Sequence, residues 1–511
     1  MDLMARIQIL NDLKDYEGIV EAIAELDEDQ MTPELVSEAA RAYLNMAEGK
    51  DRDLYILALQ LLESVNEPLA EDHKWNYRMG FANYWLDRDG DAARYFRKAL
   101  ELMPDDRESQ KLLDDCSERL SLPRFQESFR ERVHATWLDF QENEAELRSM
   151  IQADIADIRP SVEDGTENED ASDTVIQRCD ELLSRAFSNS SFELGFNGKK
   201  YVLTLTCEDG PAEVFKLVYF KEHAPASVLE RWDVEIGRQV DTSFALDIDD
   251  EQVTADSVRC WAEWDEDNVQ IALYADAVKP FLENGLHDQA WWIISALLDH
   301  TLGEICAMDL INEFSVLDAP KDTDGIPLSS LPIVLEKAGF DLSNDPTRIT
   351  DTYTVYENEP DTDEEADWRL DVVKGYTNCP PLLDGYYLGE DYLMDSFHND
   401  GAVPGFFCWP MEAIEGTDKA AAVEDFRDKL ESAILKHAGS NSVTFIGGAV
   451  GLFAGYLDFI AWDLDEVLEA AEAGFAELNM PAGVFHTFRR EAETIGVVEE
   501  EDEADHQHDE D

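Results

Sequence analysis

The spacing of small residues around Phe96 restricts the fold of this chain more than any other feature. Gly80, Ala92 and Ala99 stand where two helices can approach closely because no bulky side chain intervenes, and Phe96 fills the groove between them. Pro104 follows, and proline cannot continue a helix because it lacks an amide hydrogen and clashes with the preceding turn. The pattern predicts an antiparallel helical hairpin that ends before Pro104.

This pattern resembles the tetratricopeptide repeat (TPR), in which helix pairs stack into a solenoid. Trp75 and Tyr84 lie one position from the register of that family, and Asn83 occupies its tyrosine position. The resemblance implies a surface that holds a protein or peptide partner. We name Asn76, Asn83 and Tyr84 as candidate partner-binding residues. A generic helical bundle is the alternative.

Similar signals extend the helical region over residues 1–120. Leu10–Leu26 reads as an earlier hairpin, Leu54–Val65 as the second helix of another, and Arg107–Leu120 as a capping helix. Repeat solenoids need about three such units for stability. We therefore expect an all-α, TPR-like solenoid at the N-terminus.

The chain is strongly acidic. Its 511 residues include 40 Lys and Arg against 114 Asp and Glu, which gives a formal net charge of −74. Such a field repels phosphates and anionic headgroups, so we expect no binding to nucleic acid or to a membrane surface. The acidity indicates either a well-solvated surface, which we favour because the acidic residues are spread along the chain, or attraction of a basic partner.

Cysteines and apolar segments indicate a cytoplasmic protein. The seven cysteines are widely spaced without a CxxC pair, which predicts reduced, buried thiols. Residues 1–6 lack the pattern of a signal peptide, so we expect cytoplasmic residence. The apolar segment Phe445–Trp462 contains four glycines and one charge. It predicts two buried strands joined by a glycine-rich turn rather than a membrane helix.

Changes in composition divide the chain into seven segments. An apolar stripe at helical spacing begins at Phe125, and the stretch after it is acidic and nearly free of aliphatic residues. The expected segments are the repeats (1–120), a long connecting helix (121–160), an acidic linker (161–174), a first α+β domain (175–320), a connecting segment (321–350), a second α+β domain (351–498) and a disordered acidic tail (499–511).

Strand and helix signals follow the same order, βαββαβ, in both α+β segments. This order predicts two related domains in a ferredoxin-like arrangement, each with a mainly antiparallel sheet. In the first, Asn197-Gly198 predicts a hairpin and the apolar run Val214–Phe220 a strand. In the second, Val403–Trp409 is the first strand and Val484–Phe488 the last.

Few residues suggest chemistry. His398 and Asp400, in a predicted loop, and Asp458 are the candidate catalytic residues, although the Asn-Asp-Gly run at 399–401 is first a turn signal. Arg489 and Arg490 are candidates for anion binding by bidentate hydrogen bonds, with a counterion role favoured. No pattern predicts a metal site or a cofactor.

Three other patterns have structural interpretations. His300 and Glu304 are spaced for a pair on a helix surface. Gly447–Gly451 predicts a turn or bulge, because a phosphate loop would need a helix next. Aromatic residues expected in the core are Trp291, Trp292, Phe406, Phe407 and Trp409.

The whole chain resembles multidomain bacterial TPR proteins of uncharacterised function, in stretches such as Leu217–Phe220, Trp368–Val372 and Tyr456–Asp463. The resemblance implies an architecture and no activity. Our first hypothesis is a cytoplasmic protein-interaction scaffold that binds through its repeats, since no catalytic signature identifies an enzyme. The alternative is an enzyme or a small-molecule sensor with a site between the two α+β domains.

Overall fold

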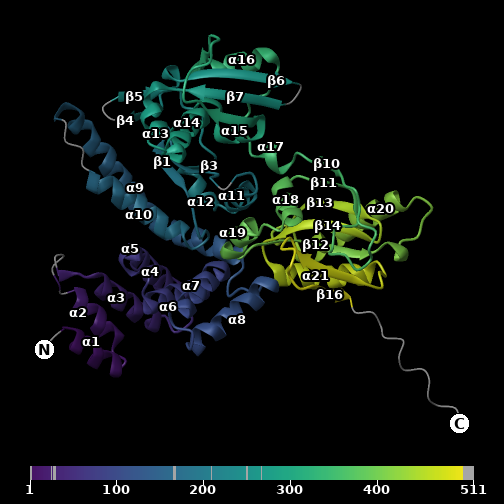
Figure 1. Cartoon of the computed structure of the whole chain (residues 1–511), viewed down its shortest axis with the longest axis horizontal. Coiled ribbons are helices and arrows are strands. Elements are labelled where there is room, and N and C mark those ends of the chain that lie inside the picture. The colour runs from purple at the N-terminus through teal and green to yellow at the C-terminus, as the bar shows by residue number, and fades with distance from the viewer. Residues whose placement is uncertain are drawn as a thin grey trace. The chain divides into compact units, whose positions relative to one another are not determined.

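The computed structural model describes residues 3–24, 26, 30–164, 169–208, 210–248, 251–265 and 268–498. Its contacts divide the chain into two compact units, each assembled from separate stretches. Figure 1 labels the elements along the chain. The first unit comprises Met1–Thr136, Asp180–Asn189 and Val355–Asp511, and the second comprises Trp137–Cys179 and Ser190–Thr354.

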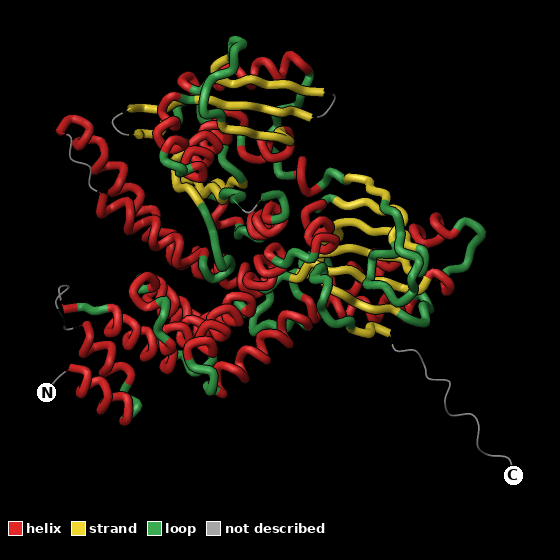
Figure 2. The backbone as a smooth tube through the Cα atoms, in the orientation of Figure 1, coloured by secondary structure: helices red, strands yellow, loops and turns green. Residues whose placement is uncertain are grey.

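The first unit begins with a region of short helices joined by tight turns (Figure 2). Helices α2 to α8 pack as stacked antiparallel pairs, most extensively α3 with α4, α6 with α7 and α7 with α8. This confirms a repeat-like helical region at the N-terminus. The helices are α1 (Leu3–Asp12), α2 (Tyr16–Ala24), α3 (Pro33–Met46), α4 (Arg52–Glu63), α5 (Asn66–Leu69), α6 (His73–Trp85), α7 (Asp89–Leu102) and α8 (Arg107–Ser121).

Local sequence sets the helix starts and the closest contact. The side chains of Thr32, Asp51 and Asp72 accept hydrogen bonds from backbone amides of the first turns of α3, α4 and α6, as N-cap residues do. A Cβ atom at Gly80 in α6 would stand 2.7 Å from the Phe96 ring of α7. The close approach predicted for this hairpin is therefore made between Gly80 and Phe96.

The C-terminal part of the first unit contains a seven-stranded sheet in the order β10-β11-β13-β14-β12-β15-β16. The paired strands from β11 to β16 run antiparallel. The strands are β10 (Thr354–Glu357), β11 (Val372–Thr377), β12 (Val403–Pro410), β13 (Val443–Gly451), β14 (Ala454–Ala461), β15 (Gly483–Thr487) and β16 (Ile495–Val498).

Helices cover this sheet as the sequence predicts for the second α+β segment. Helix α20 (Lys419–Ala438) joins β12 to β13, and α21 (Leu464–Glu477) joins β14 to β15. Both pack on the face that carries Phe407 and Phe459. Because successive side chains alternate, Phe406 projects from the opposite face. The remaining elements are α18 (Pro380–Leu388), η5 (Met411–Ala413) and α19 (Tyr392–Asp400).

The predicted hairpin at Phe445–Trp462 is confirmed. Strands β13 and β14 pair antiparallel around the turn at Leu452, with a register shift between Phe445 and Gly447. That shift is a bulge, as the glycines predict. A Cβ at Gly447 would stand 2.2 Å from the carbonyl oxygen of Tyr376 in β11, so glycine is required for the two strands to pair. Among the described residues, no helix is long and apolar enough to span a membrane.

The second unit contains three smaller sheets, in the orders β1-β2-β3, β4-β5 and β8-β7-β6-β9. Strands β2 and β3 run parallel, as do β7 and β8. The strands are β1 (Phe192–Phe196), β2 (Tyr201–Leu205), β3 (Trp232–Ile236), β4 (Ala245–Ile248), β5 (Glu251–Thr254), β6 (Arg259–Asp265), β7 (Asn268–Tyr274), β8 (Ile311–Val316) and β9 (Ile326–Pro327).

Helices connect and cover these sheets. Helix α9 begins in the first unit and, from Trp137 onward, belongs to the second, where the Trp137 ring stacks on Phe220 at 4.4 Å between centroids. The helices are α9 (Phe129–Asp164), α10 (Glu169–Leu183), α11 (Glu213–Glu222), α12 (Ala226–Leu229), η2 (Ala255–Ser257), η3 (Asp276–Val278), α13 (Lys279–Glu283), α14 (His287–Leu302), α15 (Glu304–Leu310), η4 (Leu328–Ser330), α16 (Leu331–Ala338) and α17 (Thr347–Thr350).

The strand predicted at Val214–Phe220 is wrong, because this run lies inside helix α11. Nearly all its residues are buried, and a helix buried on every side has the same continuous apolar pattern as a buried strand. The hairpin predicted around Gly198 is confirmed by the pairing of β1 with β2. Without a strand at 214–220, the first α+β segment does not repeat the element order of the second.

Segments expected to be irregular are partly helical. The acidic stretch 161–174 belongs to α9 up to Asp164 and to α10 from Glu169, and residues 165–168 lie outside the described residues, as does the tail 499–511. The stretch 321–350 contains β9, α16 and α17. All seven cysteines are free and buried, as predicted.

Candidate functional site

The candidate residues His398 and Asp400 lie at the end of helix α19, not in a loop. Gly401 adopts a left-handed conformation there and ends the helix, so the Asn-Asp-Gly run is a helix C-cap. His398 Nε2 lies 2.8 Å from Oδ2 of Asp89, and Asp400 Oδ1 accepts a hydrogen bond from the Ser188 amide at 2.6 Å. Both side chains are buried.

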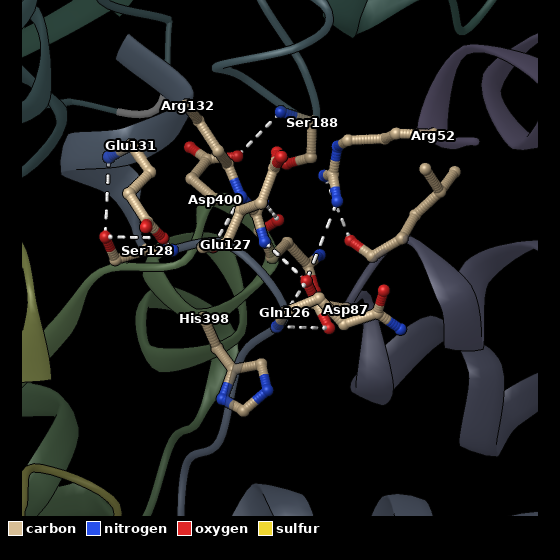
Figure 3. A network of polar contacts seen from close by, with 12 residues as sticks. Arg52, Asp87, Gln126, Glu127, Ser128, Glu131, Arg132, Ser188, His398 and Asp400 are labelled. Carbon is tan, nitrogen blue, oxygen red and sulfur yellow. Dashed lines mark hydrogen bonds and ion pairs between the residues drawn. The ribbon is translucent and has the colours of Figure 1, made fainter. Parts of the chain in front are cut away.

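Asp89 belongs to a buried cluster of charges in the first unit, which we call the Asp87 network: Asp87, Asp89, Arg52, Arg119, Arg132 and His398. Asp87 is fully buried and accepts hydrogen bonds from Arg119 at 2.6 Å and Arg132 at 2.9 Å. The Arg52 guanidinium lies 3.6 Å from Oδ2 of Asp87. Figure 3 shows Arg52 and Arg132 converging on Asp87 from α4 and α9.

The Asp87 network joins the helical region to the C-terminal part of the first unit. Arg132 also donates to the carbonyl oxygen of Asn399, in α19, at 2.7 Å. Asp87 has φ +60°, a conformation that aspartate tolerates better than most residues. Since the Asp87 carboxylate and the Arg132 guanidinium are buried and hydrogen bonded, these two groups hold elements of the fold together.

The third catalytic candidate, Asp458, is fully buried in β14 and forms an ion pair with Arg369. The Arg369 guanidinium also lies over the rings of Phe406, Tyr456 and Phe488, at 5.1 to 5.4 Å from their centroids. Tyr356 accepts a further hydrogen bond from Arg369 at 2.7 Å. Asp458 therefore stabilises the packing of the sheet, and it is not part of the Asp87 network.

The arginines proposed for anion binding are paired with acidic side chains. Arg489 contacts Asp391 at 2.7 Å and Asp395 at 2.6 Å, and Arg490 contacts Asp367 at 2.7 Å. Arg490 and Asp367 are partly exposed. Arg489 and Arg490 therefore act as counterions of these aspartates.

The three partner-binding candidates are engaged inside the helical region. Asn76 is buried, and its side-chain amide donates to the carbonyl oxygens of Ala70 and Asp72. Asn83 is buried and donates to the carbonyl oxygen of Met79 at 2.9 Å. The Tyr84 hydroxyl donates to Asp115 of α8 at 2.6 Å. In this arrangement they stabilise the helix stack.

The second unit contains an open cavity of about 470 Å³ beside Arg238. We call it the Arg238 pocket. Apolar side chains form most of its lining, together with charged side chains that contact Arg238. This combination is usual for small-molecule sites. The lining of the Arg238 pocket includes Arg238, Glu208, Asp299, Glu304, Trp291 and Trp292.

Strand topology positions this pocket. The parallel strands β2 and β3 are joined through α11 and α12, and Cys207 and Arg238 are each the second residue after the carboxyl end of a strand. Glu304, the first residue of α15, accepts hydrogen bonds from the amide of Cys207 at 2.9 Å and from that of Arg238 at 2.7 Å. Carboxyl ends of parallel strands are a common place for ligand sites.

Negative charge exceeds positive charge around Arg238. Its guanidinium lies 3.0 Å from Glu193, 3.2 Å from Glu208, 3.7 Å from Asp299 and 3.5 Å from Glu304. Burial and the neighbouring Glu304 charge raise the pKa of Asp299 to about 7, although Arg238 opposes this. A carboxyl group that titrates near neutrality in a cavity is a candidate functional group.

A cavity of similar size, about 460 Å³, lies in the first unit at the end of β12. Its lining includes Trp368, Trp409, Glu364 and Glu412. The Trp409 indole N–H is buried without an acceptor among the described residues. We take the Arg238 pocket as the main candidate because it contains the carboxyl group with the shifted pKa.

Sequence reasoning missed this pocket. Trp291 and Trp292, expected in the core, are 51% and 52% exposed, whereas Phe406, Phe407 and Trp409 are buried as predicted. His300 and Glu304, expected as a surface pair on one helix, are both buried, and Gly303 separates their helices. The spacing of Trp292, Ser295 and Asp299 on one helix face was the available signal, but nothing in the sequence links it to Arg238.

Comparisons with protein-family models, curated proteins and solved structures find no significant match to the chain. Within the described residues, no group of His, Cys, Asp and Glu is arranged to hold a metal ion.

Proposed function

We propose that this protein is an interaction scaffold that binds a protein or peptide partner through helices α1–α8. The observation that carries the proposal is that helices α1, α3 and α6 lie side by side and are joined by polar contacts. Arg41 of α3 donates to Asn11 of α1 at 2.6 Å, and Arg78 of α6 pairs with Glu38 of α3 at 2.6 Å. Stacking of this kind gives an extended surface suited to a partner segment.

The expected partner segment is basic. Since Asn76 and Asn83 are buried, the contact surface must use exposed residues of the helical region, and Glu34, Asp51 and Asp53 are exposed there. Acidic side chains on a strongly negative protein steer a basic partner toward the surface, and this attraction weakens as salt screens the charges.

Titration of the full chain with a lysine-rich peptide tests the proposal. We expect its affinity to fall with rising ionic strength and to fall severalfold in the double variant Glu34→Lys, Asp53→Lys. The matched control is Glu469→Lys, an exposed acid on α21 outside the helical region. Affinity that is independent of salt, or equal losses in the variant and the control, would show that the helical region does not provide the contact.

Small-molecule binding is a second candidate function, favoured by the Arg238 pocket. The cavity is large enough for a small ligand, and its mostly apolar lining includes the charged residues Arg238, Glu208, Asp299 and Glu304. The sequence hypothesis put such a site between two domains, whereas this cavity is lined by residues of the second unit alone.

A further inference from the structure

We propose that the Arg238 pocket binds a small organic cation, an ammonium group carried on an aromatic or aliphatic body. This inference rests on the second candidate function, because it requires that the cavity bind a small molecule. Beyond that function, the chemical class of the ligand and the residue that contacts its charge are specified.

The excess of negative charge around Arg238 favours a cationic ligand. Four carboxyl groups surround the single guanidinium of Arg238. Arg238 is therefore already compensated, and an anion entering the cavity would meet surplus negative charge. A cation would reduce that surplus, in surroundings that screen charge less than bulk water does.

Asp299 is the residue that contacts the charge of the ligand. Glu304 already accepts two backbone hydrogen bonds, from Cys207 and Arg238. Glu208 accepts from Ser191 and Arg238. Within the described residues, the polar contact found for the Asp299 side chain is the 3.7 Å approach to Arg238. Of the three carboxyl groups, Asp299 therefore has the most capacity to accept a hydrogen bond from an ammonium ion.

Aromatic side chains form part of the cavity lining. Trp291 and Trp292 are half exposed at the cavity, and the Trp291 ring lies 5.5 Å from that of Phe314. Exposing two adjacent tryptophans to water is costly unless they bind something apolar. Aromatic rings also attract ammonium groups through their faces. The lining thus suits the body of an organic cation as well as its charge.

Binding should depend on pH through Asp299. The groups that face it are Arg238, Glu193, Glu208 and Glu304, and burial followed by the Glu304 charge raises its pKa to about 7. An ammonium ion binds the ionised carboxylate. Its affinity is therefore highest above pH 7 and falls as the pH drops and Asp299 takes up a proton.

Calorimetric titration of the full chain tests the inference with two probes of similar size, 2-phenylethylamine and the neutral 2-phenylethanol. We expect the amine to bind at least tenfold more tightly than the alcohol at pH 8, and its affinity to fall about tenfold by pH 6. Asp299→Asn should remove both the preference and the pH dependence while leaving binding of the alcohol unchanged. Asp288→Asn, an exposed acid on the same helix, is the matched control and should bind as the wild type does.

The outcomes separate the ligand class from the binding function. Equal affinity for amine and alcohol would overturn the cation inference while small-molecule binding stands. If neither probe binds the folded protein, the cation inference and the proposed small-molecule binding are both overturned for ligands of this size. Unchanged amine binding in Asp299→Asn, with an unchanged melting temperature, would show that Asp299 is not the contact.

Discussion

The Asp87 network and the Arg238 pocket contain the same types of side chain in opposite proportions. In the network, two fully buried carboxylates, Asp87 and Asp89, are paired with Arg52, Arg119, Arg132 and His398. In the pocket, four carboxyl groups surround one guanidinium beside an open cavity. The first arrangement joins elements of the fold, and the second leaves a group free to meet a ligand.

The difference shows that ionisable residues must be judged by exposure and by their remaining hydrogen-bonding capacity. His398 and Asp400 have residue types suited to catalysis, yet both are buried and engaged. Asp299 stands in no recognisable motif, but it lies at a cavity with few contacts. The following variants test this contrast, beginning with the largest expected effect.

Replacing Asp87 by alanine should destabilise the first unit by about 3–5 kcal/mol, because several buried guanidinium groups lose their shared carboxylate. Urea unfolding measures the change. Glu101→Gln, an exposed acid on α7, is the control and should change stability by less than about 0.5 kcal/mol. Equal effects of the two changes would mean that the Asp87 network does not stabilise the fold.

Replacing Asp299 by asparagine should change how stability depends on pH. The folded-state pKa of about 7 is higher than the usual 3.8, so the folded protein holds this proton more tightly than the unfolded chain does. The resulting stability is fully present below about pH 4 and is lost as the pH rises through 7.

Relative to the asparagine variant, the wild type should therefore lose about 4 kcal/mol between pH 4 and 8. Thermal or urea unfolding at a series of pH values would show this. Parallel stability curves for the two proteins would contradict a raised pKa and weaken the contrast with the Asp87 network.

Filled and open regions should respond differently to added volume. Ala92 is fully buried next to Phe96, so Ala92→Phe should cost about 1–3 kcal/mol through overpacking. Ala296 lines the Arg238 pocket, and Ala296→Phe should cost less than about 1 kcal/mol because the cavity accommodates the ring. The same denaturation assay compares the two. A larger loss in Ala296→Phe would argue against the cavity.

The smallest effect is expected at the surface. Arg490→Ala removes a partly exposed ion pair with Asp367 and should change stability by less than about 1 kcal/mol. It should also leave phosphate binding, measured by calorimetry, no different from that of the wild type. A loss of measurable phosphate binding in the variant would instead support the anion site.

Local patterns in the sequence predicted much of the fold. The small residues around Phe96 specify a helix pair, and the glycine-rich run at 447–451 specifies a bulged hairpin. These features arise between residues near one another in the chain, where spacing alone sets which side chains meet. The run Val214–Phe220 marks the limit of this reasoning, because a fully buried helix and a buried strand look the same in sequence.

The sequence by itself determined the repeat-like helical region, the order of strands and helices from β12 to β15, and the strong negative charge. Only the tertiary structure decided which charged residues are buried and which line a cavity. Arg238, Asp299 and Glu304 are brought together by the carboxyl end of β3, the last turn of α14 and the start of α15. Their ionisation depends on burial and on neighbours distant in the chain, and these are properties of the folded protein that local spacing does not encode.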